Sequence, residues 1–124
     1  MAGPINVLIV EDDAFLRCEM AEMFVRLGAQ AFQAETIAQA VATASANQPD
    51  IIFCDYKLQA ENGLDCLRHI DDLAFVPAPY KVLMTGHMEL TGSSRNDIAQ
   101  LADELLAKPV PGMILRKLID ARRC

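Results

Sequence analysis

The chain has 124 residues, of which 52% are hydrophobic, and a formal net charge of −6. This length predicts one domain over residues 1–124, with enough buried surface for a core that needs no disulfides. The negative charge and the lack of a basic stripe disfavour direct nucleic-acid binding, because phosphate neutralisation supplies most of such affinity. No apolar run approaches the ~20 residues of a membrane span, so membrane insertion is not expected.

The cysteines and the N-terminal residues indicate a cytoplasmic protein. The four cysteines are Cys18, Cys54, Cys66 and Cys124, and none of them belongs to a Cys-x-x-Cys pair. Metal–thiolate or redox chemistry is therefore not expected, and buried free thiols in a reducing cytoplasm are the better interpretation. The N-terminus, Met1-Ala2-Gly3-Pro4, lacks the basic region and apolar stretch of a secretory signal.

Strand and helix patterns alternate along the chain with short connections. Apolar runs predict strands at 5–10, 31–34, 50–54, 81–84 and 104–107. Asp13 and Thr36 are placed to cap the first two helices, and Gly28 is placed to end the first. Residues 56–62 are predicted to form a loop, with Asn62-Gly63 as a turn signal.

The later helices have less distinct boundaries. The third helix is predicted through residues 64–70, which have apolar residues at helical spacing. Gly92-Ser93-Ser94 is too rich in Gly and Ser for a firm helix, so the fourth helix is predicted only over 96–102. The last helix is predicted to begin near Pro111.

Five strand–helix units predict an α/β fold with a parallel sheet that is covered on both faces. In such a sheet the carboxyl ends of all strands meet at one edge. The polar residues at these strand ends are Glu11, Asp12, Asp55, Thr85 and Lys108. Carboxylates that meet in this way repel one another unless a cation neutralises them. Mg²⁺-dependent phosphoryl chemistry on Asp55 would account for the arrangement.

These residues belong to four short motifs, each at the end of an apolar run. The motifs are Val10-Glu11-Asp12-Asp13, Phe53-Cys54-Asp55-Tyr56-Lys57-Leu58 with Asn62-Gly63, Met84-Thr85-Gly86 and Lys108-Pro109. Each motif is weak alone, but the four in this order resemble the receiver domain of two-component response regulators over essentially the whole chain. The resemblance implies a flavodoxin-like, doubly wound (βα)5 three-layer sandwich with a five-stranded parallel sheet in the order 2-1-3-4-5.

The resemblance also implies a phosphorylation site that depends on a metal ion. Asp55 would be the phosphoacceptor, whose carboxylate attacks the phosphoryl group of a partner's phosphohistidine. Asp12 and Asp55 would hold Mg²⁺, with Glu11 behind them and the backbone carbonyl of Lys57 as a further ligand. Mn²⁺ would be an acceptable substitute. Asp13, the third acid in the row, fits better as a helix cap than as a member of the acid pair.

Four further side chains would surround the phosphoryl group. Lys108 would place its positive charge against the phosphoryl oxygens, and Thr85 would donate its hydroxyl to one of them and report the phosphorylated state. His87 and Lys57 stand two residues past Thr85 and the phosphoacceptor, where the family places residues that affect the phosphoryl lifetime. Solvated side chains are an equal alternative at both positions. The Lys-Pro bond is commonly cis in the family, so we expect a cis bond at Lys108-Pro109.

Three features depart from the family pattern. Many receivers carry Tyr or Phe three residues before the lysine, where this chain has Leu105, so an aromatic switch cannot operate in its usual form. The proline often found four residues after the phosphoacceptor is replaced by Gln59, which is expected to loosen that loop. The stretch Gly92-Ser93-Ser94, which has a low helix propensity, precedes the fourth helix. A transition between order and disorder in this region is therefore an alternative way of signalling.

The sequence therefore predicts a stand-alone receiver, a phosphorylation-dependent switch or phosphorelay carrier. It would accept a phosphoryl group from a sensor histidine kinase or a histidine phosphotransfer protein. It would signal by contact with a downstream protein target, as a monomer or weak homodimer. It would not be an enzyme, although it could hydrolyse its own phosphoryl group. Two alternatives stay open: a pseudo-receiver that acts as a constitutive protein-binding module, and a receiver fragment of a hybrid histidine kinase or larger regulator.

Overall fold

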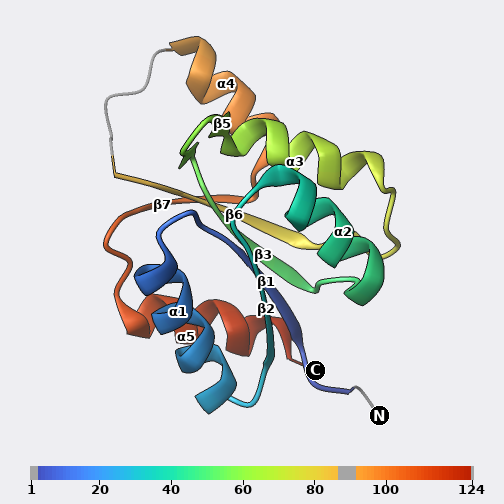
Figure 1. The fold of residues 1–124 in the computed structure, drawn as a ribbon, viewed down its shortest axis with the longest axis vertical. Coiled ribbons are helices and arrows are strands. Elements are labelled where there is room, and N and C mark those ends of the chain that lie inside the picture. The colour runs from blue at the N-terminus through green and yellow to red at the C-terminus, as the bar shows by residue number, and fades with distance from the viewer. Residues whose placement is uncertain (1–2, 87–91, 124) are drawn as a thin grey trace.

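The computed structural model describes residues 3–86 and 92–123 (Figure 1). Its strands are β1 (Asn6–Val10), β2 (Gln30–Ala34), β3 (Ile51–Asp55), β4 (Lys57–Leu58), β5 (Glu61–Asn62), β6 (Tyr80–Thr85) and β7 (Glu104–Ala107). Its helices are α1 (Ala14–Arg26), α2 (Ile37–Asn47), α3 (Gly63–Asp72), α4 (Gly92–Leu101) and α5 (Gly112–Arg122). Five strands form a parallel sheet in the order β2-β1-β3-β6-β7, which confirms the predicted 2-1-3-4-5 topology.

Helices cover both faces of this sheet, as the ribbon shows (Figure 1). Alternate residues of each strand point to opposite faces. Leu8 and Val10 of β1 therefore pack with α2, α3 and α4 in one apolar cluster. Val7 and Ile9 pack with α1 and α5 in the other. The three-layer sandwich expected from the sequence is confirmed. Separately, no helix in the described part of the chain is long and apolar enough to cross a bilayer.

The predicted helix signals of the first half of the chain are confirmed. The Asp13 carboxylate accepts hydrogen bonds from the amides of Phe15 and Leu16, at 3.0 and 3.2 Å, and so caps α1. The hydroxyl of Thr36 accepts from the amide of Gln39 at 3.2 Å and caps α2. Asp13 is thus the N-cap of α1, as the sequence predicted, and α1 begins four residues after the end of β1.

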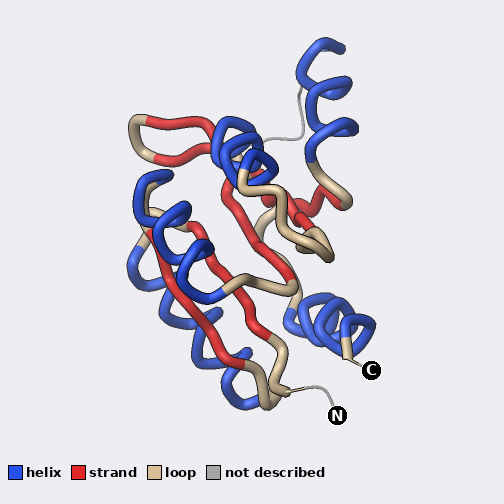
Figure 2. The backbone as a smooth tube through the Cα atoms, turned by 90° about the vertical axis from the view of Figure 1, so that its right-hand side faces the viewer, coloured by secondary structure: helices blue, strands red, loops and turns tan. Residues whose placement is uncertain are grey.

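Two predicted segments differ from the structure. Residues 57–62, expected to be a loop, contain the antiparallel hairpin β4–β5 (seen at the upper left of Figure 2), which the buried Leu58 anchors. Asn62 accepts from the amide of Leu64 at 2.7 Å and caps α3, so the Asn-Gly pair begins a helix. The helix α4 begins at Gly92, four residues earlier than predicted, because the burial of Ile98 against the α3 side outweighs the low helix propensity of its first turn.

The cysteines are only partly as expected. Cys54 and Cys66 are free and buried, which agrees with the sequence-based interpretation. Cys18 is free but exposed, so the expectation of a buried thiol was wrong at this position. Its neighbours Met20 and Ala21 take the inward face of α1, which leaves Cys18 on the outward face. Cys124 lies outside the described residues.

Candidate functional site

The carboxyl ends of the parallel strands bring the predicted residues to one edge of the sheet. Glu11 and Asp12 directly follow β1, Asp55 is the last residue of β3, and Thr85 is the last residue of β6. Lys108 directly follows β7, and its amide donates to the Thr85 carbonyl at 2.8 Å. The ends of four separate strands therefore converge on the site, as the sequence predicted from the positions of these residues at the carboxyl ends of parallel strands.

The Lys108 ammonium bridges the two buried acids of the site. Its Nζ lies 3.0 Å from Glu11 Oε2 and 3.0 Å from Asp55 Oδ2. Glu11 is 1% exposed and Asp55 is 6% exposed, so both carboxylates have lost most of their hydration. Burying two anions side by side is unfavourable without a counter-charge, and the lysine supplies one. The Lys108–Pro109 bond is cis, as expected.

Three carboxylates at this edge could share one cation. Glu11, Asp12 and Asp55 each offer an oxygen, and these oxygens all lie within 4.8 Å of one another. Hard oxygen donors in this number suit Mg²⁺, which keeps several waters and needs few protein ligands. Within the described residues, the ion pairs of these acids are with Lys108, and one lysine does not offset the charge of three ionised acids, so the donor set fits a divalent cation.

The protonation of Glu11 is shifted by its surroundings. Burial raises the pKa of the Glu11 carboxyl from 4.5 to about 7, and the negative charge of Asp55 acts in the same direction. The hydrogen bond from Lys108 and the one from the Asp13 amide, at 3.2 Å, act to lower this pKa but do not cancel the effect of burial. Near neutral pH, Glu11 is therefore poised between its acid and its anion.

Lys108 stays charged despite being partly buried. Burial acts to lower the pKa of its ammonium, but the hydrogen bonds to Glu11 and Asp55 and the charges of these acids outweigh burial. The net effect raises the pKa of Lys108 above its ordinary 10.5. A lysine held between two acids in this way is a permanent positive charge at the site.

The backbone around Asp55 is closely packed. The buried thiol of Cys54 lies 3.5 Å from the Asp55 carbonyl, and its hydrogen bond with Cys66, followed by burial, raises the pKa of the Cys54 thiol well above 9.0. Gly63 also lies against that carbonyl, and a Cβ built on Gly63 would overlap the Asp55 carbonyl oxygen. A residue with any side chain at position 63 would therefore push against the strand end that carries Asp55.

Two residues of the site were not predicted from the sequence. Gly63 was interpreted only as part of a turn, whereas the close approach to Asp55 is what requires a glycine. Arg17 was not singled out, yet its guanidinium donates to the Glu11 carbonyl at 2.8 Å. A long polar side chain one turn into a helix points back toward the helix start, and this could have indicated Arg17.

The remaining predicted residues are placed as follows. Thr85 is buried beside the strand that ends in Asp55. The amide of Lys57 lies 3.4 Å from Asp55 Oδ1 while its side chain is exposed, and the role of its carbonyl as a metal ligand stays a prediction. Leu105 is half-buried in β7 and packs with the α4 side of the core. Gln59 is exposed at the tip of the hairpin, and His87 lies outside the described residues.

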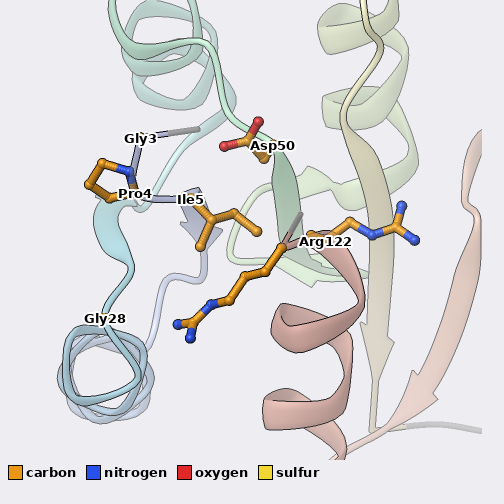
Figure 3. Close-up of a pocket in the computed structure, with 7 residues that line it drawn as sticks. Gly3, Pro4, Ile5, Gly28, Asp50 and Arg122 are labelled. Atoms are coloured by element: carbon orange, nitrogen blue, oxygen red, sulfur yellow. The ribbon is translucent and has the colours of Figure 1, made fainter. Parts of the chain in front are cut away.

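A pocket at the opposite edge of the sheet contains none of these residues. It has a volume of about 410 Å³ and lies at the amino ends of β1 and β3, beside Ile5 and Asp50 (Figure 3). The end of α5 lines it with Arg122, whose guanidinium carbon lies 4.2 Å from the centroid of the Tyr80 ring. This pocket is therefore separate from the acidic residues at the carboxyl edge.

Comparison with known proteins agrees with this geometry. A family model described as "Response regulator receiver domain" matches residues 7–120. The chain belongs to this family. Receiver domains interact with histidine kinases or phosphotransferases in two-component signalling, and a receiver domain is not an enzyme with a separate substrate. An acidic cluster such as Glu11, Asp12 and Asp55 is typical of the Mg²⁺ site of receivers.

Individual relatives of this receiver domain differ in length. It is 30% identical over 107 residues to the KDP operon transcriptional regulatory protein KdpE of Escherichia coli, covering 84% of this chain and 44% of that protein. It is 31% identical over 88 residues to the sporulation initiation phosphotransferase F of Bacillus subtilis, covering 68% of this chain and 67% of that protein. The chain thus spans less than half the length of the first of these relatives.

Solved structures share the fold. A receiver domain (CheY-like) from Methylobacillus flagellatus superposes with a TM-score of 0.87 at 23% identity, covering 98% of this chain and all of that chain. At this level of identity the likeness concerns the fold, which includes the parallel sheet that carries the acidic edge.

Proposed function

We propose that residues 1–124 form one receiver domain that accepts a phosphoryl group on Asp55 in a Mg²⁺-dependent reaction. The observation that carries this proposal is the Lys108 ammonium, 3.0 Å from the carboxylates of both Glu11 and Asp55. Asp12 completes a set of three acids around that pair. A buried cluster of acids with one fixed cation is costly to build unless it serves chemistry.

Asp55 is the nucleophile in this proposal. One of its carboxylate oxygens forms a bond to the phosphorus of a phosphohistidine on the donor protein as the nitrogen–phosphorus bond breaks. The electron pair of that bond goes to the imidazole nitrogen, and the product is an acyl phosphate on Asp55. The donor is a sensor histidine kinase or a histidine phosphotransfer protein. The Bacillus relative is itself named a phosphotransferase.

The surrounding residues oppose the electrostatic repulsion between the carboxylate and the incoming phosphoryl group. Lys108 is charged and already lies beside Asp55, so its ammonium can pair with a phosphoryl oxygen without a conformational change that brings it into the site. Asp12 and Asp55, with Glu11 and the Lys57 carbonyl, would hold Mg²⁺. When bound, this ion neutralises charge shared between the acids and the phosphoryl group.

We propose that the phosphorylated state is signalled through Thr85, at the carboxyl end of β6. Its hydroxyl is proposed to donate to a phosphoryl oxygen and so to change the loop that follows β6. Lys57 and His87 are proposed to affect the phosphoryl lifetime. Leu105 occupies the position where many receivers carry an aromatic switch residue, so we propose that signalling does not use rotation of an aromatic ring there. The domain would act in the cytoplasm, as a monomer or weak homodimer, through contact with a downstream protein.

The proposal is tested by intact-mass measurement after incubation with acetyl phosphate or phosphoramidate and Mg²⁺. Wild type is expected to gain the mass of one phosphoryl group, and Asp55→Asn is expected to gain none. Asp72→Asn, an exposed acid at the end of α3, is the matched control and should be phosphorylated like wild type. EDTA should abolish the adduct in wild type.

Absence of an adduct is interpreted with a beryllofluoride titration. A receiver that hydrolyses its acyl phosphate very fast still binds beryllofluoride in a Mg²⁺-dependent way, and that result would retain the proposal. A chain that shows neither an adduct nor beryllofluoride binding would be a pseudo-receiver, which binds its partner without phosphorylation.

A further inference from the structure

Arg17 is nearly buried and contacts three polar groups near the acidic edge. Its side chain is 14% exposed. Nη1 donates to the backbone carbonyl of Glu11 at 2.8 Å, and Nε donates to Oε1 of Gln33 at 3.1 Å. The carboxylate of Glu35 lies 4.0 Å from Nη1. The guanidinium thus joins the ends of β1 and β2 to the first turns of α1.

The start of α1 directs Arg17 toward the loop that carries the acids. Asp13 caps the helix, and the Arg17 amide donates to the Asp13 carbonyl at 2.9 Å. Side chains on a helix lean toward its N-terminus, so a long side chain at this position reaches back over the residues that precede the cap. Here it reaches the carbonyl of Glu11, the first residue after β1.

That hydrogen bond acts on the peptide unit between the two acids. The peptide bond is planar, so fixing the Glu11 carbonyl fixes the orientation of the whole Glu11–Asp12 unit. Together with the φ angle of Asp12, this orientation sets the direction in which the Asp12 side chain leaves the backbone. The peptide units on either side are tied as well, because the Glu11 amide donates to the Ala34 carbonyl at 3.0 Å and the Asp13 amide donates to Glu11 Oε1 at 3.2 Å.

We propose that Arg17 is a positioning residue for the metal-binding loop: by holding the Glu11 carbonyl against β2, it orients the Asp12 carboxylate toward the site. This inference rests on the proposed function of Asp12 as a metal ligand. Arg17 itself contacts neither the ion nor the phosphoryl group. Removing it leaves every acid of the site in place but lets the Asp12 carboxylate sample other directions, so the affinity for a divalent cation falls.

The energetics favour a positioning role over a purely stabilising ion pair. The Glu35 carboxylate is half exposed and 4.0 Å away, a geometry that contributes little to stability. Holding a guanidinium at low exposure carries a desolvation cost, and the short hydrogen bonds to Glu11 and Gln33 are what offset it. One of these bonds holds the loop that carries the acids, and the other anchors the guanidinium to a side chain of β2.

The test measures Mn²⁺ affinity by electron paramagnetic resonance of the free ion in wild type, Arg17→Ala, Arg17→Lys and Arg26→Ala. Arg26 is the matched control, an exposed arginine of the same helix that pairs only loosely with Glu22 at 3.7 Å. We expect Arg17→Ala to weaken Mn²⁺ binding about tenfold, as is common when a group that orients a metal ligand is lost. Arg17→Lys should recover part of the loss, since a lysine can reach one of the two acceptors. Arg26→Ala should bind Mn²⁺ like wild type.

Amide hydrogen exchange in the metal-free protein provides the second measurement. Arg17→Ala should speed exchange at the amides of Asp12 and Asp13, and Arg26→Ala should not. If Arg17→Ala does not fold, Gln33→Ala, which removes one anchor of the guanidinium, should show smaller changes in the same directions. Unchanged Mn²⁺ affinity in a folded Arg17→Ala protein would overturn the proposal.

The two proposals fail in different ways. If wild type binds no Mn²⁺, or binds it equally well after Asp12→Asn, the proposed metal site is wrong. In that case exchange at Asp12 and Asp13 still decides whether Arg17 holds the loop. Exchange that Arg17→Ala leaves unchanged would overturn the positioning role whatever the metal result.

Discussion

The Lys108 ammonium lies 3.0 Å from the Glu11 carboxylate, although 97 residues separate the two in the chain. The pair joins the two ends of the fold, since Glu11 follows the first strand and Lys108 follows the last. The contact exists because parallel strands present their carboxyl ends to one edge, so residues at strand ends meet whatever their separation in sequence. Its energetic consequences can be measured.

Replacing Lys108 with methionine should destabilise the metal-free protein. The methionine keeps the apolar stem but removes the positive charge that bridges Glu11 and Asp55. Removing one partner of a buried ion pair typically costs about 3 kcal/mol, and we expect a loss of that size at pH 8. Urea unfolding measures it, with Lys117→Met on the exposed surface of α5 as the control. A loss no larger than that of Lys117→Met would show that the acids do not depend on the lysine.

The stability of the metal-free protein should fall between pH 5 and pH 8 because of Glu11. Burial raises the pKa of this carboxyl from 4.5 to about 7 in the folded state. A group that binds its proton more tightly when folded contributes stability that is complete below pH 4.5 and is lost as the pH rises through 7. The full effect amounts to at most about 3 kcal/mol.

Urea unfolding in EDTA at several pH values checks this dependence. Glu11→Gln cannot ionise at this position, so its stability should change less with pH than that of wild type. Lys108 does not contribute in this range, because its pKa is raised above 10.5 and it stays charged. Parallel pH profiles for wild type and Glu11→Gln would contradict the assignment.

Mg²⁺ should stabilise the protein more at pH 8 than at pH 5.5. The ion binds ionised carboxylates, so at the lower pH it must displace the proton of Glu11, which has a pKa of about 7. The rise in Tm with Mg²⁺ measures the effect by linkage. Asp12→Asn removes one of the three clustered acids and should reduce the rise at both pH values. An equal rise at both pH values, or one that survives Asp12→Asn, would place the ion elsewhere.

The parts of the fold that could be predicted are those that follow from continuous burial. β1, β3 and β6 are almost wholly buried, so their apolar runs marked them to within a residue or two at each end. The hairpin β4–β5 could not be found in this way, because it has only two residue pairs and its side chains do not alternate over a useful length. The start of α4 depends on contacts with α3, which no local pattern contains.

The residues of the candidate site likewise fall into those that could be predicted from strand topology and those whose roles depend on three-dimensional contacts. Glu11, Asp55 and Lys108 could be predicted because their positions at strand ends depend on topology alone. Gly63 and Arg17 were missed, because their roles depend on where a Cβ or a long side chain points in space, and only the backward lean of side chains in a first helical turn offered a signal for Arg17. Both residues contact a backbone carbonyl at the end of a strand. A search of the sequence for titratable side chains does not consider such backbone groups.

Replacing Gly63 with alanine should destabilise the fold and slow phosphorylation. The new Cβ would overlap the Asp55 carbonyl, and backbone at a strand end cannot move aside as a flexible side chain can. Overpacking of this kind costs about 1–3 kcal/mol, and the better helix propensity of alanine recovers less than about 1 kcal/mol of it. We therefore expect a net loss of stability in urea unfolding, together with a slower gain of mass from acetyl phosphate.

The matched control for this prediction is Gly112→Ala at the start of α5. There the new Cβ would lie 3.2 Å from the terminal Cε of Met23, a flexible side chain that can rotate away. Both glycines are the first residue of a helix, so the propensity gain is similar and the difference between the two variants isolates the clash with Asp55. Equal stability in the two variants would mean that the strand end tolerates the side chain, and the site would then not require a glycine at position 63.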